Sequence, residues 1–137
     1  MKESQKFEFL EHTADIKIRV YGKTLDEIFE NAALAVSQYL SPDKKIEAKK
    51  VRIINVQGID SQSLLSNFLD ELIYLLDAER FAVAKAKIVL RGNNLKAELS
   101  GDSASKYAIK EIKAATYAEM YIKKIGSEWE AQFVMDV

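Results

Sequence analysis

The sequence predicts an α+β fold, a single two-layer domain with two helices packed on one face of a mainly antiparallel (mixed) β-sheet. Three observations predict it: two segments with helical apolar spacing, several segments in which apolar and polar residues alternate, and their order along the chain. A strand, a helix, a strand and a helix are followed by four strands that read as hairpins. The 137 residues, 48% of them hydrophobic and 30% charged, fit one domain over residues 1–137 with one core.

The two helices have recognisable starts. Thr24 and Glu27 have the spacing of a capping box, and apolar residues then recur at helical intervals, which predicts a helix from Leu25 to Leu40. Pro42 stops it because proline biases the preceding residue away from the helical conformation. A second helix is expected from Ser61 to Glu79, with Asp60 or Ser61 as its cap and a broad apolar stripe.

The strands are predicted from period-2 alternation and from the turns between them. The clearest begins at Asp15 and ends at Gly22, with Ile16, Ile18 and Val20 on its apolar side. Glycine and asparagine at residues 91–94 supply the positive φ of a hairpin turn, and residues 126–127 form another turn. The other expected strands are 51–56, 81–90, a returning strand that starts at 95 and ends at 101–102, 111–123 and 129–136, with a loop over 103–110. The short apolar run 7–10 is a candidate first half of a strand pair that is broken at 11–14.

Composition excludes several classes of protein. The chain has no cysteine, so disulfides, thiolate zinc sites and cysteine nucleophiles are ruled out. The net charge of −1 argues against a protein whose main role is to coat a phosphate backbone. Neither a signal peptide nor a membrane span is expected, so the predicted location is the cytoplasm. With one histidine in the chain, a metal site must rely on oxygen ligands, which suit Ca²⁺, Mg²⁺ or Mn²⁺.

The phase of the alternation singles out three charged residues. Asp15, Lys113 and Asp136 all fall on the side opposite the apolar residues of their strands. Asp15 opens a strand and Asp136 closes one, so their carboxylates could converge if the two strands are antiparallel neighbours. The terminal carboxylate at Val137 would lie beside them and complete a seat for Ca²⁺ or Mg²⁺.

Other interpretations of these residues remain open. Aspartates on the open face of a sheet are common, and Lys113 could be a snorkelling lysine of a central strand. His12 could be a ligand or a base, or a hydrogen-bonded residue that shapes the turn before Asp15. No glycine-rich phosphate loop, GxSxG or HExxH motif is present, so no independent enzyme is expected. A small metal-dependent phosphohydrolase built on the same aspartates is the enzymatic alternative.

The chain resembles the archease family in blocks that run in order from the first predicted strand to the last residue. FLEHTAD at 9–15 and YGKTL at 21–25 are similar to the N-terminal signature of that family. The other blocks are FENAA at 29–33, LIYLLDAE at 72–79, EIKAATY at 111–117 and MDV at 135–137. The chain departs from the family pattern at Ala118 and near Tyr107, where many relatives have histidine.

The resemblance implies an accessory protein without catalysis of its own. Archeases assist the GTP-dependent tRNA-splicing RNA ligase, which joins a 2′,3′-cyclic phosphate or 3′-phosphate end to a 5′-hydroxyl. They promote guanylylation of the ligase and its repeated turnover, so RNA is expected to be reached only indirectly. By motif match, Asp15, Asp136 and Val137 would hold a divalent metal, Ca²⁺ first and Mg²⁺ or Mn²⁺ next, with His12 supporting and Lys113 as the family lysine. A chaperone-like modulator of a tRNA cytosine methyltransferase is the alternative role.

Overall fold

The structure, a computed structural model, describes residues 5–10 and 15–137. The predicted helices have the expected bounds, and the expected strands are all present, most of them with ends shifted by one to three residues. A short 3-10 helix, Ala104–Lys106, lies in the stretch predicted to be a loop. The elements are β1 (Phe7–Leu10), β2 (Asp15–Gly22), α1 (Leu25–Leu40), β3 (Lys50–Gln57), α2 (Ser61–Glu79), β4 (Phe81–Arg91), β5 (Asn94–Ser103), β6 (Ala114–Ile125) and β7 (Glu128–Asp136).

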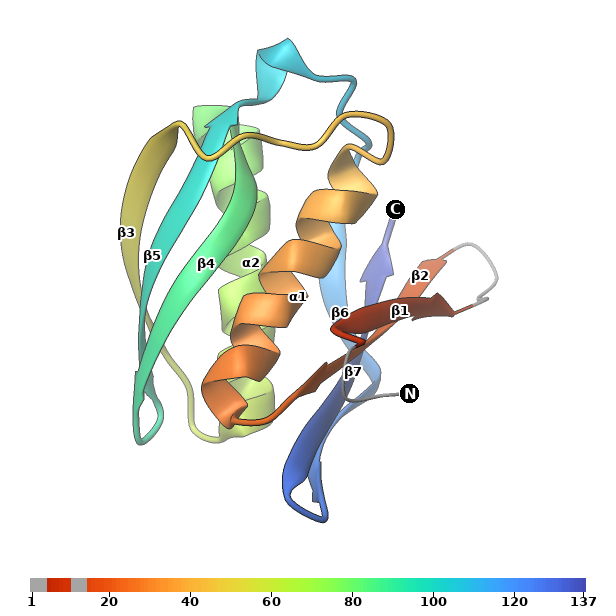
Figure 1. The fold of residues 1–137 in the computed structure, drawn as a ribbon, viewed down its shortest axis with the longest axis vertical. Helices are drawn as coiled ribbons and strands as arrows, with labels where there is room; N and C mark the ends of the chain where they lie inside the picture. Colours follow the sequence, from red (N-terminus) through yellow and green to blue (C-terminus); the bar gives the residue numbers. More distant parts are fainter. Residues whose placement is uncertain (1–4, 11–14) are drawn as a thin grey trace.

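The strands form two antiparallel sheets with the two helices between them (Figure 1). One sheet has the order β1-β2-β7-β6 and the other the order β3-β5-β4, and each helix contacts strands of both sheets. The predicted α+β class, with two helices packed against antiparallel strands, is confirmed. The prediction of one mixed sheet is wrong, because alternation reports the buried face of a strand and not its neighbours.

The positions of the helix ends follow from their caps. Thr24 Oγ1 accepts a hydrogen bond from the amide of Glu27 at 3.2 Å, and the Glu27 carboxylate accepts one from the amide of Lys23 at 2.9 Å. At the start of α2, Asp60 and Ser63 bond reciprocally in a capping box. These side chains satisfy amides that the first turn of a helix leaves unpaired, so both predicted starts are confirmed.

The two helices supply nearly half of the buried hydrophobic residues because they are covered on two sides. In α1 only Gln38 is exposed, as expected for a helix enclosed by two sheets. Phe29 of α1 and Phe68 of α2 meet edge to face, with ring centroids 5.7 Å apart, and both are completely buried. Each such side chain contributes about 1.5–3 kcal/mol by its burial. On the four-stranded sheet, Ile18 and Phe133 face this core, so the alternate residues of β2 and β7 point outward.

Candidate functional site

The strands β2 and β7 bring the two predicted aspartates together. They pair antiparallel, and Asp15 and Asp136 are Cα partners at the end of the ladder. Directly opposite residues in such a ladder have Cβ atoms about 4.5–5.5 Å apart, on the same face of the sheet. The two carboxylates therefore lie next to each other, although the residues are far apart in sequence.

The acidic pair lies on the outer face of the four-stranded sheet. Its neighbours Ile16 and Met135 are themselves Cα partners, and both pack into the core, Met135 with no exposed surface. Asp15 is half-buried and Asp136 is exposed. Like charges directly opposite each other in a ladder are destabilising, so this end of the sheet is a place where a bound cation would be stabilising.

The third predicted residue, Lys113, reaches the same place through its backbone. It immediately precedes β6, and its amide donates a hydrogen bond to the carbonyl oxygen of Asp136 at 2.8 Å. Ala114, the first residue of β6, is the Cα partner of Asp136. The Lys113 side chain is exposed. Asp15, Asp136 and Lys113 thus meet at one end of three adjacent strands.

The predicted environment of Lys113 was nevertheless wrong in two respects. β6 is an edge strand and begins at Ala114, so Lys113 is not part of a central strand. The predicted assignment of inward and outward residues is also wrong before residue 117. Ala115 packs against the core, while Thr116 faces outward and is paired with Val134. From Thr116 to Tyr121 the chain advances five residues along β6, whereas the paired segment of β7 advances only two residues. The odd number of extra residues reverses the parity of the strand.

Of the two remaining residues predicted at the metal site, the structure describes only Val137. Val137 is half-buried and its side chain packs against the core, one residue beyond Asp136. His12 lies outside the described residues, so its predicted supporting role stays a prediction.

The donors at this end of the sheet fit a hard cation incompletely. Among residues 5–10 and 15–137, no group of three or more histidine, cysteine, aspartate or glutamate side chains could hold a metal. Two carboxylates suit the chemistry of Ca²⁺ or Mg²⁺, but Ca²⁺ takes 6–8 oxygen ligands. Water, main-chain oxygens or a partner molecule must therefore supply the rest.

A network of polar side chains along the outer face of the same sheet was not predicted. On the outer face, Arg19 donates to the Gln132 side chain at 2.9 Å, and Lys17 forms an ion pair with Glu119 at 2.6 Å. Tyr121 donates to Glu130 at 2.5 Å, and the Tyr21 hydroxyl donates to Glu8. These bonds connect all four strands of the sheet, and the bond between Arg19 and Gln132 joins β2 and β7, the two strands that carry the acidic pair.

The electrostatics of the network depend on partial burial. Burial raises the pKa of Tyr121, and its hydrogen bond to Glu130 adds to the shift, which brings the pKa to about 12. For Arg19, burial lowers the pKa of the guanidinium, but Tyr121, Tyr21 and Glu130 outweigh it and the net shift is upward. Both side chains keep their protons at neutral pH. The sequence showed Lys17 and Arg19 on the polar side of a strand, but their partners lie on strands about a hundred residues later.

The chain matches a known family over nearly its full length. The sequence model of the Archease protein family (MTH1598/TM1083) matches residues 7–137. The protein archease of Pyrobaculum neutrophilum is 40% identical over 140 residues, which cover 96% of this chain and 95% of that protein. The protein archease of Thermococcus kodakarensis is also 40% identical, over 141 residues that cover 97% of this chain and 99% of that protein.

Two solved structures are similar in fold. The solution structure of Methanobacterium thermoautotrophicum protein 1598 has a TM-score of 0.79 and 30% identity, and the alignment covers 100% of both chains. The crystal structure of an archease, possible chaperone, from Thermotoga maritima has a TM-score of 0.64 and 21% identity, over 93% of this chain and 94% of that one. At that identity the Thermotoga structure supports the fold alone.

The sheets, the enclosed helices and the acidic pair define a small α+β protein with an exposed acidic site at a sheet end. The chain belongs to the archease family. Neither helix is of the length and apolar character that crossing a membrane requires, within the residues that the structure describes.

Proposed function

We propose that this chain is an activating partner of a GTP-dependent RNA ligase that joins 2′,3′-cyclic phosphate or 3′-phosphate ends to 5′-hydroxyl ends. It promotes guanylylation of the ligase and repeated turnover in tRNA splicing and RNA repair, and it is not a stand-alone catalyst. Family membership supports the role as an accessory protein. The observation that carries the site is the register of β2 and β7, which places Asp15 opposite Asp136. We assign this role to the cytoplasm, where GTP and the ligase are expected.

The acidic pair is the part of the molecule that we assign to the ligase. Asp15 and Asp136 would hold a divalent cation, Ca²⁺ first and Mg²⁺ or Mn²⁺ next, with Val137 contributing a main-chain or carboxylate oxygen and His12 shaping the turn. A bound ion would supply positive charge that can attract phosphate oxygens. Because Asp136 is exposed and the described ligand set is small, the remaining ligands can come from the partner side. Lys113, whose amide is bonded to Asp136, has an exposed side chain that can add a positive charge near this site.

A guanylylation assay tests this proposal. Purified cognate ligase is mixed with radiolabelled GTP and Mg²⁺ or Mn²⁺, and the ligase–GMP adduct is followed with time. We expect wild-type protein to accelerate adduct formation and Asp136→Ala to lose most of that acceleration. Asp77→Ala removes an aspartate of α2 that is also exposed and serves as the matched control. If wild type and Asp136→Ala accelerate the reaction equally, or if neither does, the proposed mechanism is wrong.

The second candidate is a chaperone-like modulator of a tRNA cytosine methyltransferase. The Thermotoga structure is described as that of an archease, possible chaperone. Affinity purification of the tagged chain from its own host separates the two roles. Recovery of the methyltransferase without the ligase would favour this second candidate, and recovery of the ligase would favour the first.

A further inference from the structure

One of the two sheets carries an excess of positive charge, because β3, β4 and β5 together contain six lysines and arginines and two acidic residues. Residues 44–57 and 81–101, which build β3, β4, most of β5 and the segment leading into them, contain nine of the 20 lysines and arginines and two of the 21 acidic residues. This part of the chain has a net charge of +7, so the rest has −8, although the total is only −1. Such a local imbalance indicates a partner with the opposite charge.

Four of these cations lie together on the outer face of the three-stranded sheet, and we call Lys85, Lys87, Arg91 and Lys96 the basic face. The first three alternate along β4, and Lys96 lies on the adjacent β5. All four side chains are exposed, and within the described part of the chain none of them forms an ion pair. Glu98 is the one acidic residue on this face and is the Cα partner of Lys87. With Glu98 included, the net charge on this part of the sheet is about +3, which a negatively charged ligand can neutralise.

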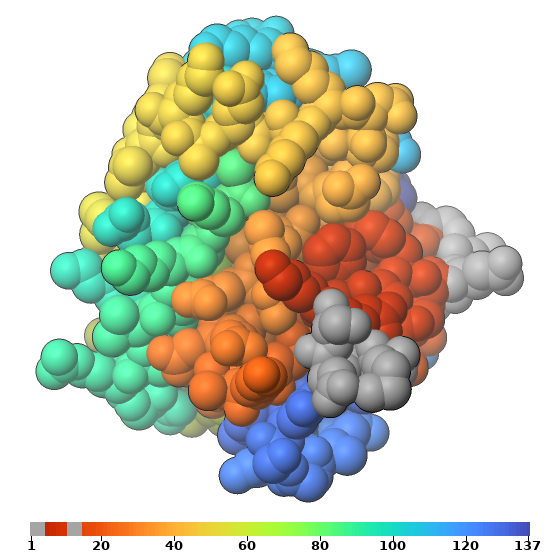
Figure 2. All heavy atoms as spheres, in the orientation of Figure 1, coloured from red at the N-terminus to blue at the C-terminus, as the bar shows by residue number. Residues whose placement is uncertain are grey.

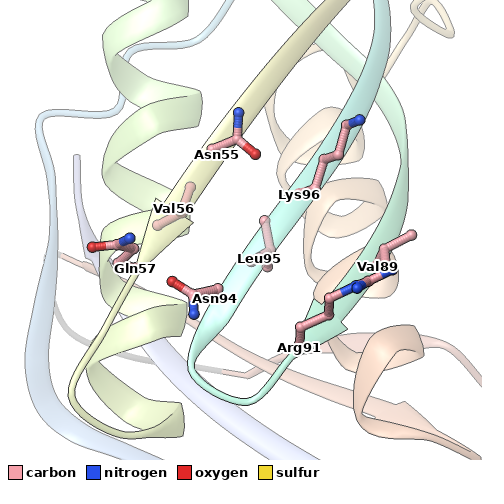
Figure 3. A pocket seen from close by; sticks show the side chains of 8 residues that line it. All are labelled: Asn55, Val56, Gln57, Val89, Arg91, Asn94, Leu95 and Lys96. Carbon is pink, nitrogen blue, oxygen red and sulfur yellow. The ribbon is translucent and has the colours of Figure 1, made fainter.

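The face is hollowed between its strands, and amide side chains line the hollow. A cavity of about 670 Å³ is open to solvent (Figure 3), and its lining consists of the polar residues Asn55, Gln57, Arg91, Asn94 and Lys96 and the apolar residues Val56, Val89 and Leu95. The amides can donate to oxygen atoms, and the two cations can neutralise a negative charge. Alternate residues on one strand are about 7 Å apart. That spacing resembles the distance between successive phosphates in an extended nucleic-acid strand.

We propose that the basic face binds the phosphodiester backbone of an RNA strand directly. Lysine, arginine and amide side chains are the groups that contact phosphate oxygens in protein–nucleic acid complexes. The residues that line the hollow include no aromatic ring on which a base could stack, so binding is independent of base sequence. An acidic protein is the less favoured partner, because the hollow offers no tyrosine or tryptophan anchor of the kind that dominates protein interfaces.

This inference goes beyond the proposed function and beyond the expectation that RNA is reached only through a partner. The helices separate the basic face from the sheet that carries Asp15 and Asp136 (Figure 1). In Figure 2 the yellow, green and cyan atoms of the chain from β3 to β5 lie at the top and left of the view, and the red atoms of β1 and β2 lie on the right. A molecule docked through the acidic pair would keep its basic face free for RNA.

Direct binding is tested with the full chain alone, without ligase, GTP or divalent metal. A fluorescein-labelled 15-nucleotide polyuridylate is titrated with protein, and its anisotropy is recorded at several NaCl concentrations. Four phosphate contacts predict that the logarithm of the association constant falls with the logarithm of salt concentration with a slope of about −3. We expect Lys87→Glu/Lys96→Glu to weaken binding at least tenfold at low salt.

The control changes the same charge on the other sheet. Lys123→Glu/Lys124→Glu replaces two exposed lysines of β6, and we expect it to leave RNA binding within twofold of wild type. Thermal unfolding of each variant by circular dichroism confirms that it is folded. Equal losses in both double variants, or no RNA binding by wild type at 50 mM NaCl, would overturn the proposal. Binding to phosphatidylserine vesicles without binding to RNA would overturn it as well, because it would assign the face to a membrane.

Discussion

Replacing Asp136 by asparagine removes one of two like charges that the β2–β7 register places opposite each other. Carboxylates on opposite residues lie roughly 6 Å apart, so their repulsion is about 0.7 kcal/mol in bulk water and about 2.8 kcal/mol at an effective dielectric constant of 20. Because Asp136 is exposed, the effect should lie near the lower figure. We therefore expect Asp136→Asn to raise the free energy of unfolding of the metal-free protein by about 1 kcal/mol or less, and Tm by roughly 3 °C.

The sign of this effect should reverse when a cation is added. An ion that binds only the folded protein stabilises it by RT ln(1 + [L]/Kd), which is about 2.7 kcal/mol at a hundredfold excess over Kd. Wild type gains this stabilisation, whereas the asparagine variant has lost one of its two carboxylate ligands and should gain little. Asp136→Asn should therefore unfold at a higher temperature than wild type in EDTA and at a lower temperature in millimolar CaCl₂.

Thermal unfolding of both proteins under the two conditions, followed by circular dichroism at low ionic strength, measures this reversal. Asp77→Asn on α2 is the matched control, since it removes an equal charge that is also exposed and far from the pair in sequence. The reasoning about the site is refuted if Ca²⁺ raises Tm of wild type and Asp136→Asn by the same amount. It is also refuted if the variant is less stable than wild type in EDTA.

Two further predictions concern the stability of the fold. Burial raises the pKa of Asp102, but hydrogen bonds from Tyr107 and the Ser103 amide and the nearby Lys106 lower it to about 2. Its ionised form therefore stabilises the fold above pH 4, and we expect Asp102→Asn to lower Tm at pH 7 by an amount that disappears as the pH falls from 4 towards 2. Gly101→Ala would place a Cβ atom 2.1 Å from the carbonyl oxygen of Ala82. Overpacking of this kind costs about 1–3 kcal/mol, so urea unfolding should show a stability at least 1 kcal/mol below that of wild type.

The first and last residues of both helices could be predicted because the residues that start and stop a helix lie next to its ends. The hydroxyl of Thr24, the carboxylate of Asp60 and the proline after α1 all lie within a few residues of the helix ends that they define. The turns at Gly92 and Gly126 were equally local, and both glycines have a φ of 62°. By contrast, the division of the strands into two sheets depends on pairings between distant segments, such as β3 with β5. Nothing in the alternation of a single strand specifies its partner.

The environment of Lys113 shows that one local irregularity in a strand can make a prediction from alternating residues wrong. The alternation along 111–123 was assigned one phase throughout, but the extra residues between Thr116 and Tyr121 reverse it. Glu119 lies in this stretch with a φ of 59°, and its carbonyl accepts a hydrogen bond from the Gln132 side chain at 2.8 Å. The bulge is therefore held by a residue of β7. Sequence alone could not reveal it, because the contact that stabilises it joins two strands.

The two charged regions of the molecule differ in how the chain builds them. Asp15 belongs to β2 and Asp136 to β7, so the acidic pair exists only once these two distant strands have paired. The basic face comes from the hairpin of β4 and β5, whose Lys87 and Lys96 are close in sequence. Its charges are plain in the sequence, yet they cancel in the net charge of −1 because acidic residues dominate elsewhere. For a protein with two opposite faces, the total charge is therefore a poor guide to its partners, and the position of each charge in the fold decides what can bind.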